Sequence, residues 1–287
     1  MKKFDKGEII MKLSNKLLLC LLFYFYSNLA FALTQINSTS ASNSGDYNNT
    51  GYGWGVLNAL QTGNALEGNY NDAFGQQALR NTTTGSYNTA TGHKSLYSNT
   101  TGSSNVASGY LSMYSNTTGY NNTATGYQSL QANTTGYYNT AVGNSSLKSN
   151  TTGLANSALG SSSLTANTTG LQNTAIGDYA LTTNTTGSYN TALGQGALKL
   201  NTTASYNTAI GNDSLYSNTT GHTNTAIGND SLEANTTGYW NTAIGNDSLQ
   251  ANTTGNYNTA IAAHSLEANT TGYSNTAIGT YALKENT

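Results

Sequence analysis

The chain has 287 residues, of which only 8% are charged and none is proline, while Gly, Asn, Ser and Thr dominate and 21 residues are tyrosine. A typical globular protein has about 25% charged residues and about 5% proline, so this composition indicates either a disordered chain or a repeat protein. From residue 33 onward, five basic residues face ten acidic ones, a formal net charge of −5 with no basic stripe, and this balance argues against a nucleic-acid partner.

Residues 1–32 have the parts of a secretory signal peptide. Lys12 and Lys16 precede an apolar run at residues 17–26, and residues 30–32 form an A-x-A cleavage site. The apolar run is shorter than the roughly 20 residues that cross a bilayer. We therefore expect export through the Sec pathway, cleavage after Ala32 and no stable membrane insertion afterwards. The product would be secreted, at the cell surface or in the periplasm.

An internal repeat of 17 residues fills most of the remaining chain. Residues 33–48 are interpreted as a flexible N-terminal leader, and residues 49–70 as an imperfect first coil that forms an N-terminal cap. From Asn71, thirteen units with the consensus N-T-A-I-G-x-x-S-L-x-x-N-T-T-G-x-x continue to residue 287 without insertion or deletion. Positions 1 to 17 of a unit are numbered from this first Asn.

The repeat length predicts a parallel β-solenoid. Seventeen residues cannot bury a core alone, so each unit must pack on its neighbours, and a helical repeat needs roughly 33 residues. A coil with two short strands and two tight turns fits the unit and adds about 4.8 Å along the axis. The expected fold is all-β, a β-solenoid or β-roll of about 13–14 coils with 17 residues per coil.

The positions that stay apolar suggest which side chains form the core. Position 9 is Leu in every unit except that of Met113, and position 4 is aliphatic or Phe in ten of the thirteen. Alternate residues of a strand face the same side, so we expect positions 2 and 4 to point inward and the invariant Ala of position 3 outward. The alternative is that Ala fills a cramped inner corner. An outward Ala ladder predicts an oligomer face made of Ala141, Ala158, Ala175, Ala192, Ala209, Ala226 and Ala243.

Glycine and asparagine recur where the backbone has special requirements. Gly at positions 5 and 15 is expected where φ is positive or where no room exists for a Cβ. Asn at positions 1 and 12 is expected to stack its amide on the equivalent Asn one coil away.

The N-T-A-I-G-x-x-S and T-T-G strings resemble the head-domain repeats of trimeric autotransporter adhesins, whose pattern is similar to N-S-V-A-I-G-x-x-S. The resemblance covers residues 71–287, with a 17-residue rather than a 14-residue unit. It implies a left-handed parallel β-roll, three protomers side by side and adhesion at a bacterial surface. It also implies that Ile210, Ile227 and Ile244 face the core.

Two features are candidates for binding. Asp213, Asp230 and Asp247 occupy position 7 of three successive units, so their carboxylates should stack about 5 Å apart, either solvated or bridged by a cation such as calcium. No other cofactor or metal is indicated. Aromatic residues at positions 16 and 17 could form a ridge for sugar rings or a partner protein, or could simply pack along an edge; they are Tyr137, Tyr138, Tyr239, Trp240, Tyr257 and Tyr273.

No set of catalytic residues stands apart from the repeat, so we do not expect an enzyme. We expect a secreted or surface-exposed adhesin-like rod in cell-surface or host attachment. Its partners would be its own copies, most simply in a trimer, and a host glycan or surface protein. One alternative is a curli-like matrix or amyloid subunit. The other is an ice-binding β-solenoid that uses Thr ladders at positions 13 and 14.

Overall fold

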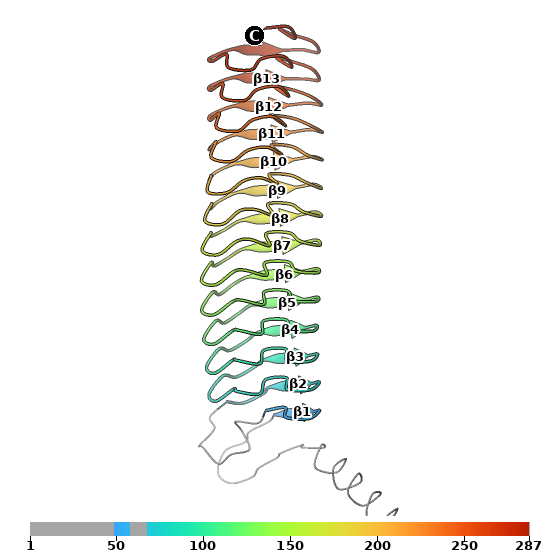
Figure 1. Cartoon of the computed structure of the whole chain (residues 1–287), viewed down its shortest axis with the longest axis vertical. Coiled ribbons are helices and arrows are strands. Elements are labelled where there is room, and N and C mark those ends of the chain that lie inside the picture. Colours follow the sequence, from blue (N-terminus) through green and yellow to red (C-terminus); the bar gives the residue numbers. More distant parts are fainter. Residues whose placement is uncertain (1–48, 58–67, 287) are drawn as a thin grey trace, which may run out of the picture.

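The computed structural model describes residues 49–57 and 68–286. Fourteen parallel strands form one sheet in sequence order, and Figure 1 shows them stacked as a rod with one strand in each coil. The predicted β-solenoid is confirmed, whereas the predicted signal peptide and the leader at residues 33–48 lie outside the described residues. The strands are β1 (Thr50–Tyr52), β2 (Asp72–Phe74), β3 (Thr89–Thr91), β4 (Val106–Ser108), β5 (Thr123–Thr125), β6 (Thr140–Val142), β7 (Ser157–Leu159), β8 (Thr174–Ile176), β9 (Thr191–Leu193), β10 (Thr208–Ile210), β11 (Thr225–Ile227), β12 (Thr242–Ile244), β13 (Thr259–Ile261) and β14 (Thr276–Ile278).

The repeat fixes the register between coils. In β10 and β11, for example, Ala209 pairs with Ala226. β1 pairs with β2 through Thr50 and Asp72, so the chain between them contains five more residues than a regular coil.

Each coil has one three-residue strand, not the two that were predicted. Positions 6 to 11 form consecutive turns instead, because positions 7 and 9 both have positive φ, as at Lys94 (54°) and Leu96 (49°). A strand requires negative φ. The backbone of this side still bonds to the next coil, with Leu96 N donating to Ser112 O at 3.0 Å.

The predicted inside and outside of the strand are reversed in the structure. Every position-3 Ala from Ala73 to Ala277 is buried, while positions 2 and 4 are exposed or half-buried, as for Ile176 at 37% exposure. The expectation that Ile faces the core is therefore wrong for the position-4 residues Ile210, Ile227 and Ile244. The predicted oligomer face is also wrong, because its side chains lie inside the protomer; it comprised Ala141, Ala158, Ala175, Ala192, Ala209, Ala226 and Ala243.

The core tolerates Ala because polar side chains fill the rest of it. Two columns of fully buried Asn run beside the Leu column. At position 1, the Asn88 side-chain amide donates to Asn71 Oδ1 at 3.0 Å and to Gly102 O at 2.9 Å. At position 12, Asn116 donates to Asn99 Oδ1 at 2.9 Å. The predicted stacking of Asn amides is confirmed, and these columns are buried in the same core as the Ala of position 3.

Both predicted reasons for glycine occur in the structure. Gly92, at position 5, has φ of 128°, and a Cβ there would meet the backbone of Gly109 in the next coil. Gly102, at position 15, needs no positive φ, but a Cβ would collide with Gly119 O and the side chain of Asn99. Gly92 is therefore required for conformation and space, and Gly102 for space alone; Ala262 at position 5 and Ala204 at position 15 are the exceptions.

Candidate functional site

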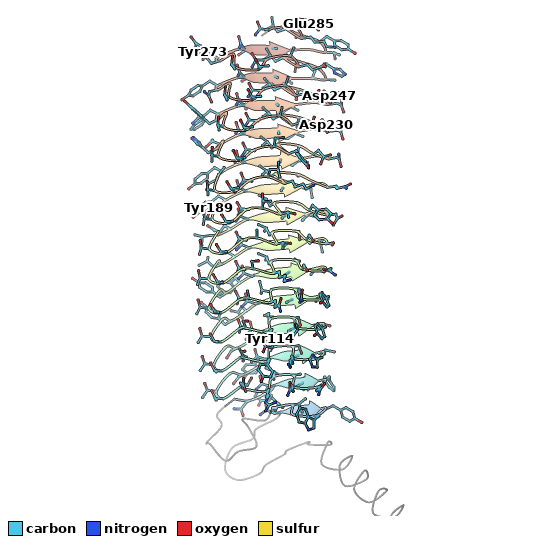
Figure 2. All side chains as sticks on the ribbon, viewed as in Figure 1. Tyr114, Tyr189, Asp230, Asp247, Tyr273 and Glu285 are labelled. Carbon is cyan, nitrogen blue, oxygen red and sulfur yellow. The ribbon has the colours of Figure 1, made fainter. Side chains whose placement is uncertain are left out.

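The side chains outside the core gather on two edges of the rod. Figure 2 shows Tyr189 and Tyr273 on one edge, and Asp230 and Asp247 on the opposite edge. We call them the aromatic edge, made of the rings at positions 16 and 17, and the charged edge, made of positions 6 and 7 together with the neighbouring positions 10 and 11. Tyr114, at position 10, lies nearer the middle of the rod in Figure 2. The strand carries positions 2 and 4 outward on the face between them.

Three tyrosines form the first cluster of the aromatic edge. The rings of Tyr120 and Tyr137, one coil apart at position 16, stack with centroids 4.7 Å apart, and Tyr138 meets both edge-on. Partial burial and then the two neighbouring phenols raise the pKa of Tyr120. Tyr137 and Tyr138, two of the predicted aromatic residues, are thus in contact with each other. Tyr120, which lies 17 residues before Tyr137, contacts both.

A second cluster lies toward the C-terminal end of the aromatic edge. His222 stacks on Tyr239 with centroids 5.1 Å apart, and Tyr257 meets Tyr239 edge-on at 5.5 Å. Trp240 and Tyr273 are exposed, at 55% and 75%. The six predicted aromatic residues therefore fall into two separate groups on one edge.

The backbone directs position 17 outward. Tyr138, Trp240 and Tyr257 all have φ between 56° and 58°, a left-handed conformation in which a bulky side chain is uncommon. Because every coil repeats this turn, a large side chain at position 17 is held at the surface, and these three rings are each more than half exposed.

The three predicted aspartates do lie in one column on the charged edge. Each carboxylate accepts a hydrogen bond from the preceding Asn side chain, as for Asp213 from Asn212 at 2.8 Å. His264 continues the column one coil after Asp247, 3.5 Å from its carboxylate. Within residues 49–57 and 68–286, no group of three or more His, Cys, Asp and Glu side chains is arranged to hold a metal ion.

The charged edge also contains stacks that the sequence analysis did not single out. Tyr97 stacks on Tyr114 at 5.1 Å, and Tyr110 on Tyr127 at 5.4 Å. The sequence pattern that could have predicted these stacks is again a pair of tyrosines 17 positions apart.

In one of the two Thr ladders, the hydroxyls donate hydrogen bonds to the backbone of the next coil. At position 13, Thr100 Oγ1 donates to Thr117 O at 3.0 Å in the next coil. The exposed Thr101 belongs to the second ladder, at position 14.

No helix in the described part of the chain is long and apolar enough to cross a membrane. Comparison with protein-family models, with curated proteins and with solved structures found no match to this chain.

Proposed function

We propose that the protein is a surface-exposed, adhesin-like structural rod that attaches a cell to a host or to another surface through its aromatic edge. The observation that carries the proposal is the exposure of Tyr138, Trp240, Tyr257 and Tyr273 on a single edge of a stack of coils whose strands form one continuous hydrogen-bonded sheet. Exposing large aromatic side chains to water in a regular array is unfavourable in free energy, and such arrays typically mark a surface that binds a partner.

The chemistry of this edge favours an uncharged partner. Positions 12 to 17 contain no Asp, Glu, Lys or Arg in any coil from residue 82 to residue 274. The apolar faces of neutral sugars pack well on Tyr and Trp rings, and the hydroxyls of Thr and Ser beside them can bond to sugar hydroxyls. A neutral glycan is therefore the ligand class that fits best, with a protein surface as the other.

A glycan array and a cell-binding assay with the purified protein test this function. Replacing Trp240 and Tyr257 by Asn, which position 17 already carries at Asn121, keeps the left-handed backbone and should abolish binding. The matched control replaces Tyr110 and Tyr127, which are similarly exposed on the charged edge, and should bind like the wild type. Equal binding by all three proteins would contradict the proposal.

The proposal also includes self-association. Because the predicted Ala face is buried, we assign the interface to the outer side of the strands. From β6 to β14 every strand carries Val, Leu or Ile at position 4, on its outer side, with Thr or Ser at position 2. This strand face extends over nine coils, about 43 Å at 4.8 Å per coil, which is long enough for a specific interface between copies. Ile227→Arg should lower the mass measured by light scattering if a trimer or another small oligomer forms here.

Export is the third part of the proposal. It rests on the basic, apolar and A-x-A segments of residues 1–32. Sequencing of the protein recovered from the cell exterior should find Leu33 as the first residue, and a retained leader would contradict it.

A further inference from the structure

The charges of the rod are confined to one edge. The described residues contain thirteen Asp, Glu, Lys and Arg side chains, and twelve of them lie at positions 6, 7, 10 or 11. The exception is Asp72, in strand β2. The aromatic edge and the rest of the strand face have none.

The two signs are also separated along this edge. Its N-terminal part has four cations and one anion, a formal charge of +3, and its C-terminal part has six anions and one cation, a formal charge of −5. The first part comprises Arg80, Lys94, Lys148, Asp178 and Lys199. The second comprises Asp213, Asp230, Glu233, Asp247, Glu267, Lys284 and Glu285.

Within the described residues, no cation of the N-terminal part forms an ion pair with a carboxylate, although Asp213 in the next coil attracts Lys199. Arg80 and Lys94 lie over the ring of Tyr97, at 5.9 and 5.8 Å from its centroid. Lys199 lies over Tyr216 and donates to its hydroxyl at 3.1 Å, a bond that raises the pKa of the lysine. The ion pairs of this edge are in its last coils, around His264 and Glu267. Most of the charge on both parts therefore remains available to a partner.

We propose that the charged edge binds a second copy of this chain in antiparallel orientation, about a two-fold axis at the level of β7. An antiparallel copy places its acidic part beside the basic part of the first, and the two-fold symmetry repeats each contact. A parallel copy would set like charges side by side along the whole edge, which is unfavourable.

The axis at β7 follows from counting coils outward in both directions. Lys148 lies one coil before β7 and Asp178 one coil after it, so they face each other across the interface. Lys94, four coils before, faces Asp230 and Glu233, four coils after.

Four further charges also fit this register. Arg80 faces Asp247, each five coils from β7. Lys199 and Asp213 meet the uncharged coils of β5 and β4, so none of these four residues opposes a like charge. Moving the axis by one coil, to β8, would place Asp178 against its own copy.

Tyrosines on the same edge supply contact area between the charges. Tyr110, Tyr127 and Tyr179 are 43–48% exposed, and aromatic residues of this kind are enriched in protein interfaces. The charges mainly set the orientation and register of the pair. Because exposed charges are screened beyond about 8 Å at physiological ionic strength, the association should weaken steeply with salt.

Sedimentation of the purified full chain at low and high salt is the first test. In the Ile227→Arg background, which removes association through the strand face, we expect a dimer at low salt that dissociates as salt is added, with Lys148→Glu and Asp178→Lys each raising Kd about tenfold. The double variant Lys148→Glu/Asp178→Lys exchanges the two charges and should restore the wild-type Kd. Circular dichroism checks that each variant is folded. No loss in the single variants, or no rescue in the double one, would overturn the proposal.

Cross-linking tests the orientation separately, in a Cys20→Ser background that removes the single cysteine. Gln76 and Asn246 are exposed at position 6, five coils on either side of β7. A mixture of Gln76→Cys and Asn246→Cys proteins should form the mixed disulfide faster than either protein pairs with itself. Faster self-pairing would show parallel packing and refute the antiparallel edge. Association through the strand face would survive high salt and respond to Ile227→Arg, so the two surfaces are distinguishable.

Discussion

The side-chain amide of Asn116 donates to Asn99 Oδ1 at 2.9 Å, and Asn133 in turn donates to Asn116 Oδ1 at 2.7 Å. Each of these amides also donates to the glycine carbonyl three residues later in its own coil, as Asn116 does to Gly119 O at 3.0 Å. The N-T-T-G string thus has a structural role in every coil that contains it. Its Asn closes the turn of its own coil and joins that turn to the next coil.

Replacing one residue of this ladder should be costly. Asn150→Ala removes the donor to Asn133 Oδ1 and to Gly153 O, and the acceptor of Asn167. Each unsatisfied buried group costs about 1–3 kcal/mol, so we expect a loss of about 3 kcal/mol or more in the free energy of unfolding, measured by denaturation in urea.

The matched control for this prediction is Asn144→Ala. Asn144 is exposed at position 6, where a surface substitution should change stability by less than about 0.5 kcal/mol. Equal losses for the two variants would show that the ladder does not contribute as argued.

Two adjacent residues of β8 test which side of the strand is the core. Ala175 is fully buried, whereas Ile176 is 37% exposed. Ala175→Arg should therefore prevent folding, because a guanidinium has neither space nor a partner among the Asn and Leu columns. Ile176→Arg should leave the circular dichroism spectrum unchanged. A folded Ala175→Arg protein would contradict the observed packing.

Much of the fold was predictable because the period determines it. Thirteen units without insertion require stacked coils in register, and the recurring Gly and Asn positions have the roles expected of them. The strand orientation was not predictable in the same way. It was inferred from where aliphatic residues recur, yet polar Asn ladders occupy the core, and a core filled by amides accepts Ala where an apolar core would need a larger side chain.

The candidate sites were predictable only as columns. Sequence spacing places Asp213, Asp230 and Asp247 on one column, but not their Asn and His264 contacts. The segregation of charge onto one edge also required the structure, because positions 6, 7, 10 and 11 come together only when positions 7 and 9 turn the chain through positive φ.

Ala262 stands at position 5, where the other units have glycine, and its replacement by glycine should stabilise the rod. Its φ is 95°, a conformation that strains a residue with a Cβ by about 1–3 kcal/mol. Glycine removes the strain but gives the unfolded chain more freedom, which costs about 0.4–1 kcal/mol. We expect Ala262→Gly to stabilise the rod by about 1 kcal/mol, seen as a higher Tm. The reverse change at Gly211 should lower Tm, because the Cβ would meet Gly228.

Removing one charge from the aspartate column should stabilise the rod at neutral pH. Partial burial, then Glu233, then Asp247 raise the pKa of Asp230, while the amide of Asn229 opposes the shift. A carboxyl whose pKa is higher in the folded state binds its proton more tightly there than in the unfolded chain. Its contribution to stability is therefore greatest in acid. Stability falls as the pH rises through the window between the ordinary pKa of Asp and the raised one, and the penalty persists at pH 7.

Asp230→Asn removes this penalty and keeps a residue type that tolerates the left-handed backbone of position 7. We expect a higher Tm than wild type at pH 7 and no difference at pH 3, below both pKa values. Added salt should reduce the rise in Tm at pH 7, because salt screens the repulsion of Asp230 by Glu233 and Asp247. Asp178→Asn, on the same edge but outside this column, is the control and should change Tm little at either pH. A gain for Asp230→Asn that persists at pH 3 would mean that its cause is packing rather than charge.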